Sequence, residues 1–90
     1  MTYEREIEAL RKEINRLNME IVEKLAERVE AAKQIGDVKK KHGKPVVDKS
    51  REAKVYQQIR KLAESENLDP LKVEKVFKEI VELCTGVQLK

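Results

Sequence analysis

Cysteine, glycine, proline and aromatic residues are all scarce in this sequence. Its 90 residues include one Cys, three Gly, two Pro and no Trp, and aromatic residues make up 3%. The single cysteine, Cys84, excludes an internal disulfide framework and fits a reducing compartment. With so few aromatic residues, the core must be built from Leu, Ile, Val and Ala, which suits packed helices. Neither a signal peptide nor an apolar run of 18 residues is present, so we expect a soluble, cytoplasmic protein that spans no membrane.

Charge is abundant but nearly balanced. Charged residues make up 41% of the chain, and 20 basic and 17 acidic side chains leave a net charge of +3. Because this surplus is small and no basic block is interleaved with aromatic residues, we expect no nucleic-acid partner. The pI near 9.0 is compatible with an anionic ligand. The length and the 40% hydrophobic content predict one folded domain over residues 1–90.

A stretch without proline, from Glu4 to Lys41, dominates the sequence. Its apolar residues recur at spacings of three, four or seven: Ile7, Leu10, Ile14, Leu17, Ile21, Leu25, Ala32 and Ile35. This is the period of one helix face, and such a helix is about 57 Å long. A compact domain of this size has a radius of gyration of about 12 Å. The chain therefore cannot cover the helix, and we expect a symmetric dimer.

Cations interrupt the apolar stripe of this helix. On an ideal helix Arg28 and Lys39 lie within the stripe, about 16 Å apart along the axis. A charge there must reach solvent, pair or meet a ligand, because an unpaired buried charge is costly. Arg11 lies at the edge of the stripe, about 26 Å from Arg28. Arg11 can therefore serve the same small pocket only from a second copy of the chain.

Local signals predict where the first helix ends and the second begins. Gly43 and Pro45 end the first helix near His42, which we interpret as a solvated capping residue. Asp48 can accept from backbone N–H groups and so cap a second helix, from about Lys49 to Ser65.

A third helix begins with Asp69 as its cap and Pro70 in its first position. Its apolar stripe includes Cys84, and Gln88 points the same way because it follows Cys84 by four residues. Laid antiparallel on the first helix, the two shorter helices can cover only part of it. We therefore expect an all-α fold, with a very long first helix and two shorter ones, in an intertwined homodimer.

Polar residues at apolar or helix-start positions form the candidate site: Arg11, Arg28, Lys39, Asp48, Arg51, Glu52 and Gln88. None of them pairs a nucleophile with a base, and no metal-ligand spacing is present, so we expect neither a metal nor a cofactor. Arginine pairs with carboxylates through two parallel hydrogen bonds. Such a set suits a small polyanion and a reaction that needs only positioning and charge stabilisation.

Several segments together resemble the all-helical class of chorismate mutases. They are Ala9-Leu10-Arg11, Leu25-Ala26-Glu27-Arg28, Ile35-Gly36-Asp37-Val38-Lys39, Pro45-Val46-Val47-Asp48, Arg51-Glu52 and Gln88. The resemblance covers nearly the whole chain in order. It implies the rearrangement of chorismate to prephenate at the branch leading to Phe and Tyr, in a homodimer with two active sites.

The resemblance also implies a role for most residues of the site. Arg28 and, from the other chain, Arg11 hold the two carboxylates of the dianionic substrate. Lys39 and Gln88 donate to the ether oxygen of the breaking bond.

At the other end of the substrate, Glu52 accepts from the ring hydroxyl, helped by the backbone near Asp48, and Arg51 adds positive potential at the rim. Cys84 stands where a small hydroxyl residue is expected to help bind a carboxylate. Because a thiol is a weak donor, the sequence does not establish whether Cys84 contacts the carboxylate.

Two other functions remain as alternatives. A lyase that removes pyruvate from isochorismate shares the scaffold, and only product identification separates the two reactions. A helical dimer that docks a partner without catalysis is the second alternative, and it predicts an apolar stripe free of buried cations. The 90 residues leave no room for a fused enzyme or a regulatory domain, so we expect no feedback site.

Overall fold

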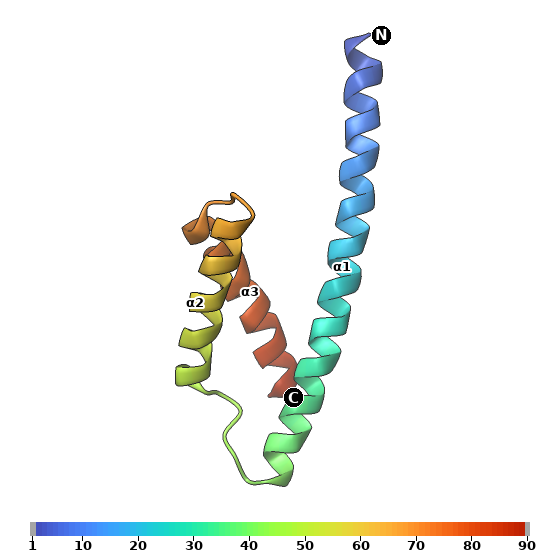
Figure 1. Cartoon of the computed structure of the whole chain (residues 1–90). Helices are drawn as coiled ribbons and strands as arrows, with labels where there is room; N and C mark the ends of the chain where they lie inside the picture. The colour runs from blue at the N-terminus through green and yellow to red at the C-terminus, as the bar shows by residue number, and fades with distance from the viewer. Residues whose placement is uncertain (1, 90) are drawn as a thin grey trace.

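A computed structural model describes residues 2–89 of the chain and contains three α-helices with no strand in that range (Figure 1). Helix α1 spans Tyr3–Lys41, α2 spans Lys49–Ser65 and α3 spans Pro70–Gln88. These bounds confirm the all-α prediction of one very long helix followed by two shorter ones.

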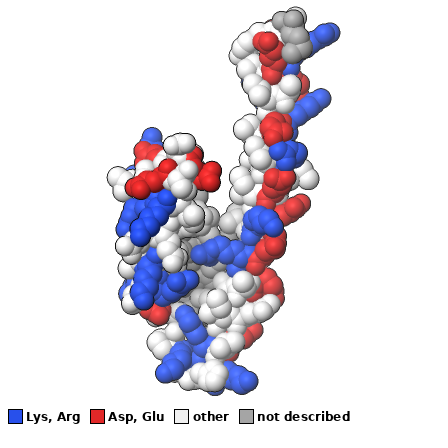
Figure 2. Space-filling view, in the orientation of Figure 1, with Lys and Arg blue, Asp and Glu red and all other residues white. Residues whose placement is uncertain are grey.

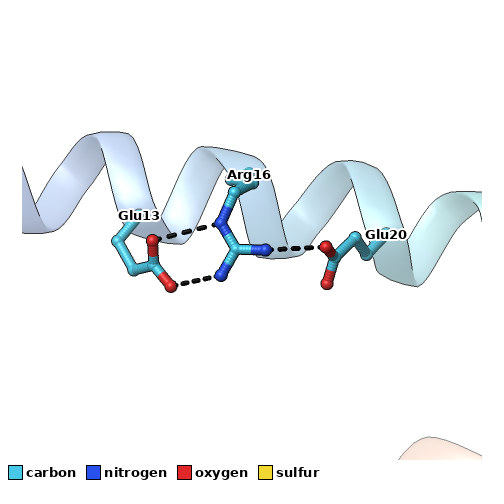
Figure 3. A network of polar contacts seen from close by, with 3 residues as sticks. All are labelled: Glu13, Arg16 and Glu20. Carbon is cyan, nitrogen blue, oxygen red and sulfur yellow. Dashed lines mark hydrogen bonds and ion pairs between the residues drawn. The ribbon is translucent and has the colours of Figure 1, made fainter.

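Helix α1 is stabilised by local interactions along much of its length. The Thr2 hydroxyl caps it by accepting from the Arg5 N–H over 3.3 Å. On the exposed surface Arg16 bridges one turn back to Glu13 and one turn forward to Glu20, 2.6 Å away (Figure 3). Such pairs at spacings of three and four support a helix that has few tertiary contacts.

The ends of the helices carry the predicted signals. After α1, Gly43 adopts a φ of 65°, the left-handed conformation that glycine accommodates without strain. The Asp48 carboxylate caps α2 by accepting from the Arg51 N–H over 3.0 Å. Asp69 caps α3 by accepting from the N–H groups of Leu71 and Lys72.

Helix α3 is the central element of the packing. It packs against α1 on one side and α2 on the other, and among the described residues no close backbone approach joins α1 to α2. The expectation that both shorter helices cover α1 is therefore wrong. The loop after α1 places α2 at a distance from that helix. Among residues 2–89, α3 is the helix that packs against α1 (Figure 1). An ion pair from Arg60 to Glu74 also ties α2 to α3.

The N-terminal half of α1 extends beyond the other helices (Figure 1). The radius of gyration is 17.2 Å and the longest extent 62 Å, larger than for a compact chain of this length. Leu10, Ile14 and Ile21 of the apolar stripe are 62%, 55% and 57% exposed. The apolar residues that are buried are Ala32, Ala63 and Cys84. Across residues 2–89, no helix combines the length and apolar character needed to cross a membrane.

Candidate functional site

A cavity of about 480 Å³ lies where the C-terminal half of α1, the loop after it, α2 and the end of α3 face one another. Seven of the eight candidate site residues line it: Arg28, Lys39, Asp48, Arg51, Glu52, Cys84 and Gln88. The remaining wall is mainly apolar: Ala31, Ala32, Ile35, Val46, Val47, Val55, Val81 and Thr85. The structure thus brings together charged residues from α1 and the start of α2 with the uncharged polar residues of α3, on an apolar background.

Arg28 enters the cavity from the middle of α1. Its side chain is half-buried, and its Nη1 donates to the Sγ of Cys84 on α3 over 2.8 Å. This contact uses one of the five guanidinium N–H donors. The others are available to bind an anion in the cavity.

Lys39 lies near the C-terminal end of α1, half-buried beside the loop that follows. Its Nζ donates to the main-chain oxygen of Val46 over 2.8 Å. The contact ties the loop to α1 and holds the ammonium group at the cavity wall. Since an ammonium has three N–H donors, two remain for a ligand.

Asp48, Arg51 and Glu52 line the cavity from the first turn of α2. The Asp48 carboxylate is occupied as the helix cap, accepting from the Arg51 N–H. Glu52 is half-buried and lies 3.5 Å from the exposed ammonium of Lys49, whereas Arg51 is exposed. Glu52 thus supplies the half-buried acceptor of this wall, and Arg51 lies at its rim.

Gln88 is the last residue of α3. Its Nε2 donates to the main-chain oxygen of Ala32 on α1 over 2.8 Å, and its side chain is half-buried. Gln88 is thus held against α1 at the end of α3. One N–H and the amide oxygen remain available at the cavity.

Arg11 is the candidate residue that does not line the cavity. It is exposed on the N-terminal half of α1. Arg28 lies 17 positions further along the same continuous helix, which is about 26 Å along the axis. Within one chain, Arg11 cannot contact a small ligand bound at Arg28.

The electrostatics of the cavity favour an anion. Three cationic and two acidic side chains line it, a formal charge of +1. Lys and Arg side chains gather around the hollow between α1 and α2 (Figure 2). Near this wall the pKa of Tyr56 is raised, first by burial of the phenol and then by the negative charge of Glu52, whereas Arg28 acts in the opposite direction.

Sequence reasoning missed the main-chain acceptors of the site. The carbonyls of Val46 and Ala32 hold Lys39 and Gln88, but a carbonyl belongs to every residue and carries no sequence signal. Thr85 also lines the cavity and was missed; its place three residues before Gln88 on the same helix was the available signal. Among residues 2–89, no group of three His, Cys, Asp or Glu side chains could hold a metal ion.

Residues 10–89 match the family described as chorismate mutase type II. The chain belongs to this family. A chorismate mutase of Methanocaldococcus jannaschii is 33% identical over 79 residues, covering 88% of this chain and 80% of that protein. This relative and the family match bear out the resemblance to the all-helical chorismate mutases.

Two further relatives are longer proteins. A bifunctional chorismate mutase/prephenate dehydratase of Aquifex aeolicus is 32% identical over 88 residues, and the T-protein of Enterobacter agglomerans is 32% identical over 76 residues. The matches cover 94% and 84% of this chain but only 24% and 20% of those proteins. Together with the family match, these names support a chorismate mutase, an isomerase of aromatic amino acid biosynthesis.

Proposed function

We propose that this chorismate mutase converts chorismate to prephenate in the cavity between its three helices, in a homodimer whose partner subunit completes each site. The observation that carries the proposal is the convergence of Arg28, Lys39 and Gln88, from two helices, on one cavity of about 480 Å³. A cavity of this size suits a small molecule.

The reaction requires correct positioning of the substrate more than it requires catalytic acids, bases or nucleophiles. The rearrangement breaks a C–O bond while it forms a C–C bond, so neither a proton transfer nor a covalent intermediate is needed. Negative charge builds on the ether oxygen, and preorganised donors stabilise it best away from water. Lys39 and Gln88 each retain N–H donors beyond those used on Val46 and Ala32. We assign these two residues as the donors to the ether oxygen.

Carboxylate binding accounts for the arginines. The two carboxylates of the substrate repel each other and favour an extended molecule, whereas reaction needs a folded, chair-like one. Arg28 and Arg11 of the partner subunit each bind one carboxylate and offset this repulsion. With Arg11 of the partner subunit, the formal charge of the site rises from +1 to about +2, which matches a dianion.

The first turn of α2 binds the ring end of the substrate. Glu52 accepts from the ring hydroxyl, and the backbone near Asp48 contributes to the same contact. Arg51 adds positive potential at the rim, where its exposure leaves it free to meet an incoming anion.

The exposed apolar stripe of α1 favours a second copy of this chain as the partner that covers it. In an antiparallel pair of α1 helices, a two-fold axis between Met19 and Glu20 sets Ile14 level with Leu25 of the partner subunit. The same register sets Arg11 level with Arg28 of the partner subunit, because both pairs share this midpoint. One arrangement thus covers the apolar residues and completes the site. Light scattering is expected to give twice the 10.5 kDa of one chain.

Product analysis tests the proposed function. Purified protein is incubated separately with chorismate and isochorismate, and the products are identified by proton NMR, with Arg28→Ala as the control. Conversion of chorismate to prephenate, lost in the control, is expected. Release of pyruvate from isochorismate, with chorismate untouched, would instead identify a lyase. If neither compound reacts with folded protein, the chain is a binding module and the proposal is wrong.

A further inference from the structure

Gly36 is buried in the interior of α1 and is not required there by backbone conformation. Gly43, after the end of α1, has a positive φ that favours glycine, whereas Gly36 does not. Glycine inside a helix weakens it relative to alanine, because the unfolded chain gains freedom. Another feature must therefore account for a glycine at position 36.

That feature is the close approach of Gln88. A Cβ on Gly36 would lie 3.0 Å from the Cγ of Gln88, 3.2 Å from its Cβ and 3.4 Å from its Cα. The first two distances are tighter than ordinary van der Waals contact. A side chain at position 36 therefore requires Gln88 to move by a few tenths of an ångström.

The close approach of Gln88 to Gly36 also lets the side-chain amide of Gln88 form a hydrogen bond to the main chain of α1. Its Nε2 donates to the oxygen of Ala32, which lies one helical turn before Gly36 on the same face of α1. This bond holds the amide at a fixed distance and orientation beside the cavity.

We infer that Gly36 is a positioning residue for Gln88: the missing side chain lets the amide bind the Ala32 carbonyl, which aims its second N–H into the cavity. The inference rests on the proposed function for its catalytic consequence, though not for the contact itself. Preorganised donors lose effect when displaced by fractions of an ångström. Gly36 therefore influences the rate without touching the substrate.

Kinetics of Gly36→Ala test this role. We expect kcat to fall about tenfold or more and KM to change less than about twofold, because the arginine clamps are unaffected. Gly86→Ala is the matched control, since it makes the same change inside a helix but has no atom within 4 Å of the added Cβ. The control is expected to keep the parental kcat.

A double-mutant cycle separates positioning from a general structural defect. In a Gln88→Ala background the amide is gone, so adding Gly36→Ala is expected to lower kcat by less than about threefold further. If Gly36→Ala lowers kcat by the same factor whether residue 88 is Gln or Ala, it does not act through the amide. A parental kcat in Gly36→Ala would equally overturn the inference.

The contact can also be observed without activity. In NMR spectra of the parent, the side-chain amide of Gln88, assigned by its absence in Gln88→Ala, is expected to exchange with solvent about tenfold more slowly than those of the exposed Gln57 and Gln58. In Gly36→Ala the Gln88 amide is expected to exchange with solvent as fast as the amides of Gln57 and Gln58. Equal exchange rates in the parent would overturn the inference even if Gly36→Ala fails to fold.

The two measurements also separate this inference from the proposed function. A parent without activity but with a protected Gln88 amide contradicts the proposed function and leaves the contact in place. An active parent whose Gln88 amide is unprotected contradicts the inference alone.

Discussion

The guanidinium of Arg28 on α1 donates a hydrogen bond of 2.8 Å to the Sγ of Cys84 on α3. Cys84 is buried, and its sulfur is the acceptor of this contact. The thiol therefore helps to hold the arginine that we assign to a substrate carboxylate. This relationship connects a residue that departs from the expected pattern with one at the centre of the proposed mechanism.

Substitution of Cys84 tests its part in placing Arg28. Cys84→Ser keeps a small acceptor and adds a stronger donor, so KM is expected to stay equal or fall. Cys84→Val replaces the thiol by a slightly larger apolar side chain and so removes the acceptor, and KM is expected to rise about fivefold, the equivalent of one modest hydrogen bond. Steady-state kinetics of both variants check this, and equal KM values for Ser and Val would contradict it.

Arg28 is expected to require its guanidinium as well as its charge. Arg28→Lys keeps the charge but loses the planar fork that binds a carboxylate with two hydrogen bonds, so kcat/KM should fall at least about tenfold. Arg16→Lys, on the exposed surface of the same helix, is the matched control and should be unchanged. A lysine variant at position 28 within twofold of the parent would contradict the assigned role.

Gln88→Glu is expected to make the activity depend on pH. A carboxyl group can donate to the ether oxygen only when protonated, and its ordinary pKa is about 4.3. Activity should therefore be low near neutral pH and rise as the medium is acidified towards that value, until unfolding intervenes. Gln88→Ala should be about 10²–10³ slower than the parent without that recovery. Rates from about pH 4 to pH 8 check this, and a glutamate variant with parental activity at pH 7 would contradict it.

The ion pair between Arg60 and Glu74 is expected to stabilise the packing of α2 on α3. The Glu74 side chain is only 16% exposed, so Arg60→Ala leaves a poorly solvated carboxylate without its partner. We expect a loss of about 1 kcal/mol, which lowers Tm by about 4–8 °C. Arg16→Ala, which breaks an exposed network within α1, is the control and should leave Tm nearly unchanged. Equal Tm changes in the two variants, measured at one protein concentration, would contradict this.

Local signals in the sequence predicted the helices closely. The first helix was predicted over residues 4–41 and begins one residue earlier, and the second was predicted from Lys49 to Ser65, as observed. Caps such as Asp48 and Asp69 act within three residues along the chain, so their effect is visible in the sequence.

Contacts between helices were predicted less well. The helical period placed Arg28 and Lys39 on one face, and both line the cavity. The period cannot indicate that α2 packs on α3 and, within residues 2–89, not on α1, because that depends on the path of the loop after α1. Nor can it identify the carbonyls of Val46 and Ala32 as acceptors, since main-chain groups are the same at every position.

We propose that each active site joins the cavity of one chain to Arg11 of the partner subunit. Arg11→Ala and Arg28→Ala are each expected to be nearly inactive. A heterodimer of the two has one site with both arginines intact, so an equal, fully exchanged mixture should recover about a quarter of the parental activity. Arg28→Ala mixed with Lys39→Ala is the control. Both residues line the cavity of the same chain, so no site is restored.

Chorismate turnover by these two mixtures tests the shared site most directly. It is measured after native mass spectrometry has shown that the chains exchange. Recovery of activity near one quarter of the parental value is expected for the Arg11 and Arg28 pair, and none for the Arg28 and Lys39 pair. Exchanged Arg11 and Arg28 variants that stay inactive together would contradict the shared site.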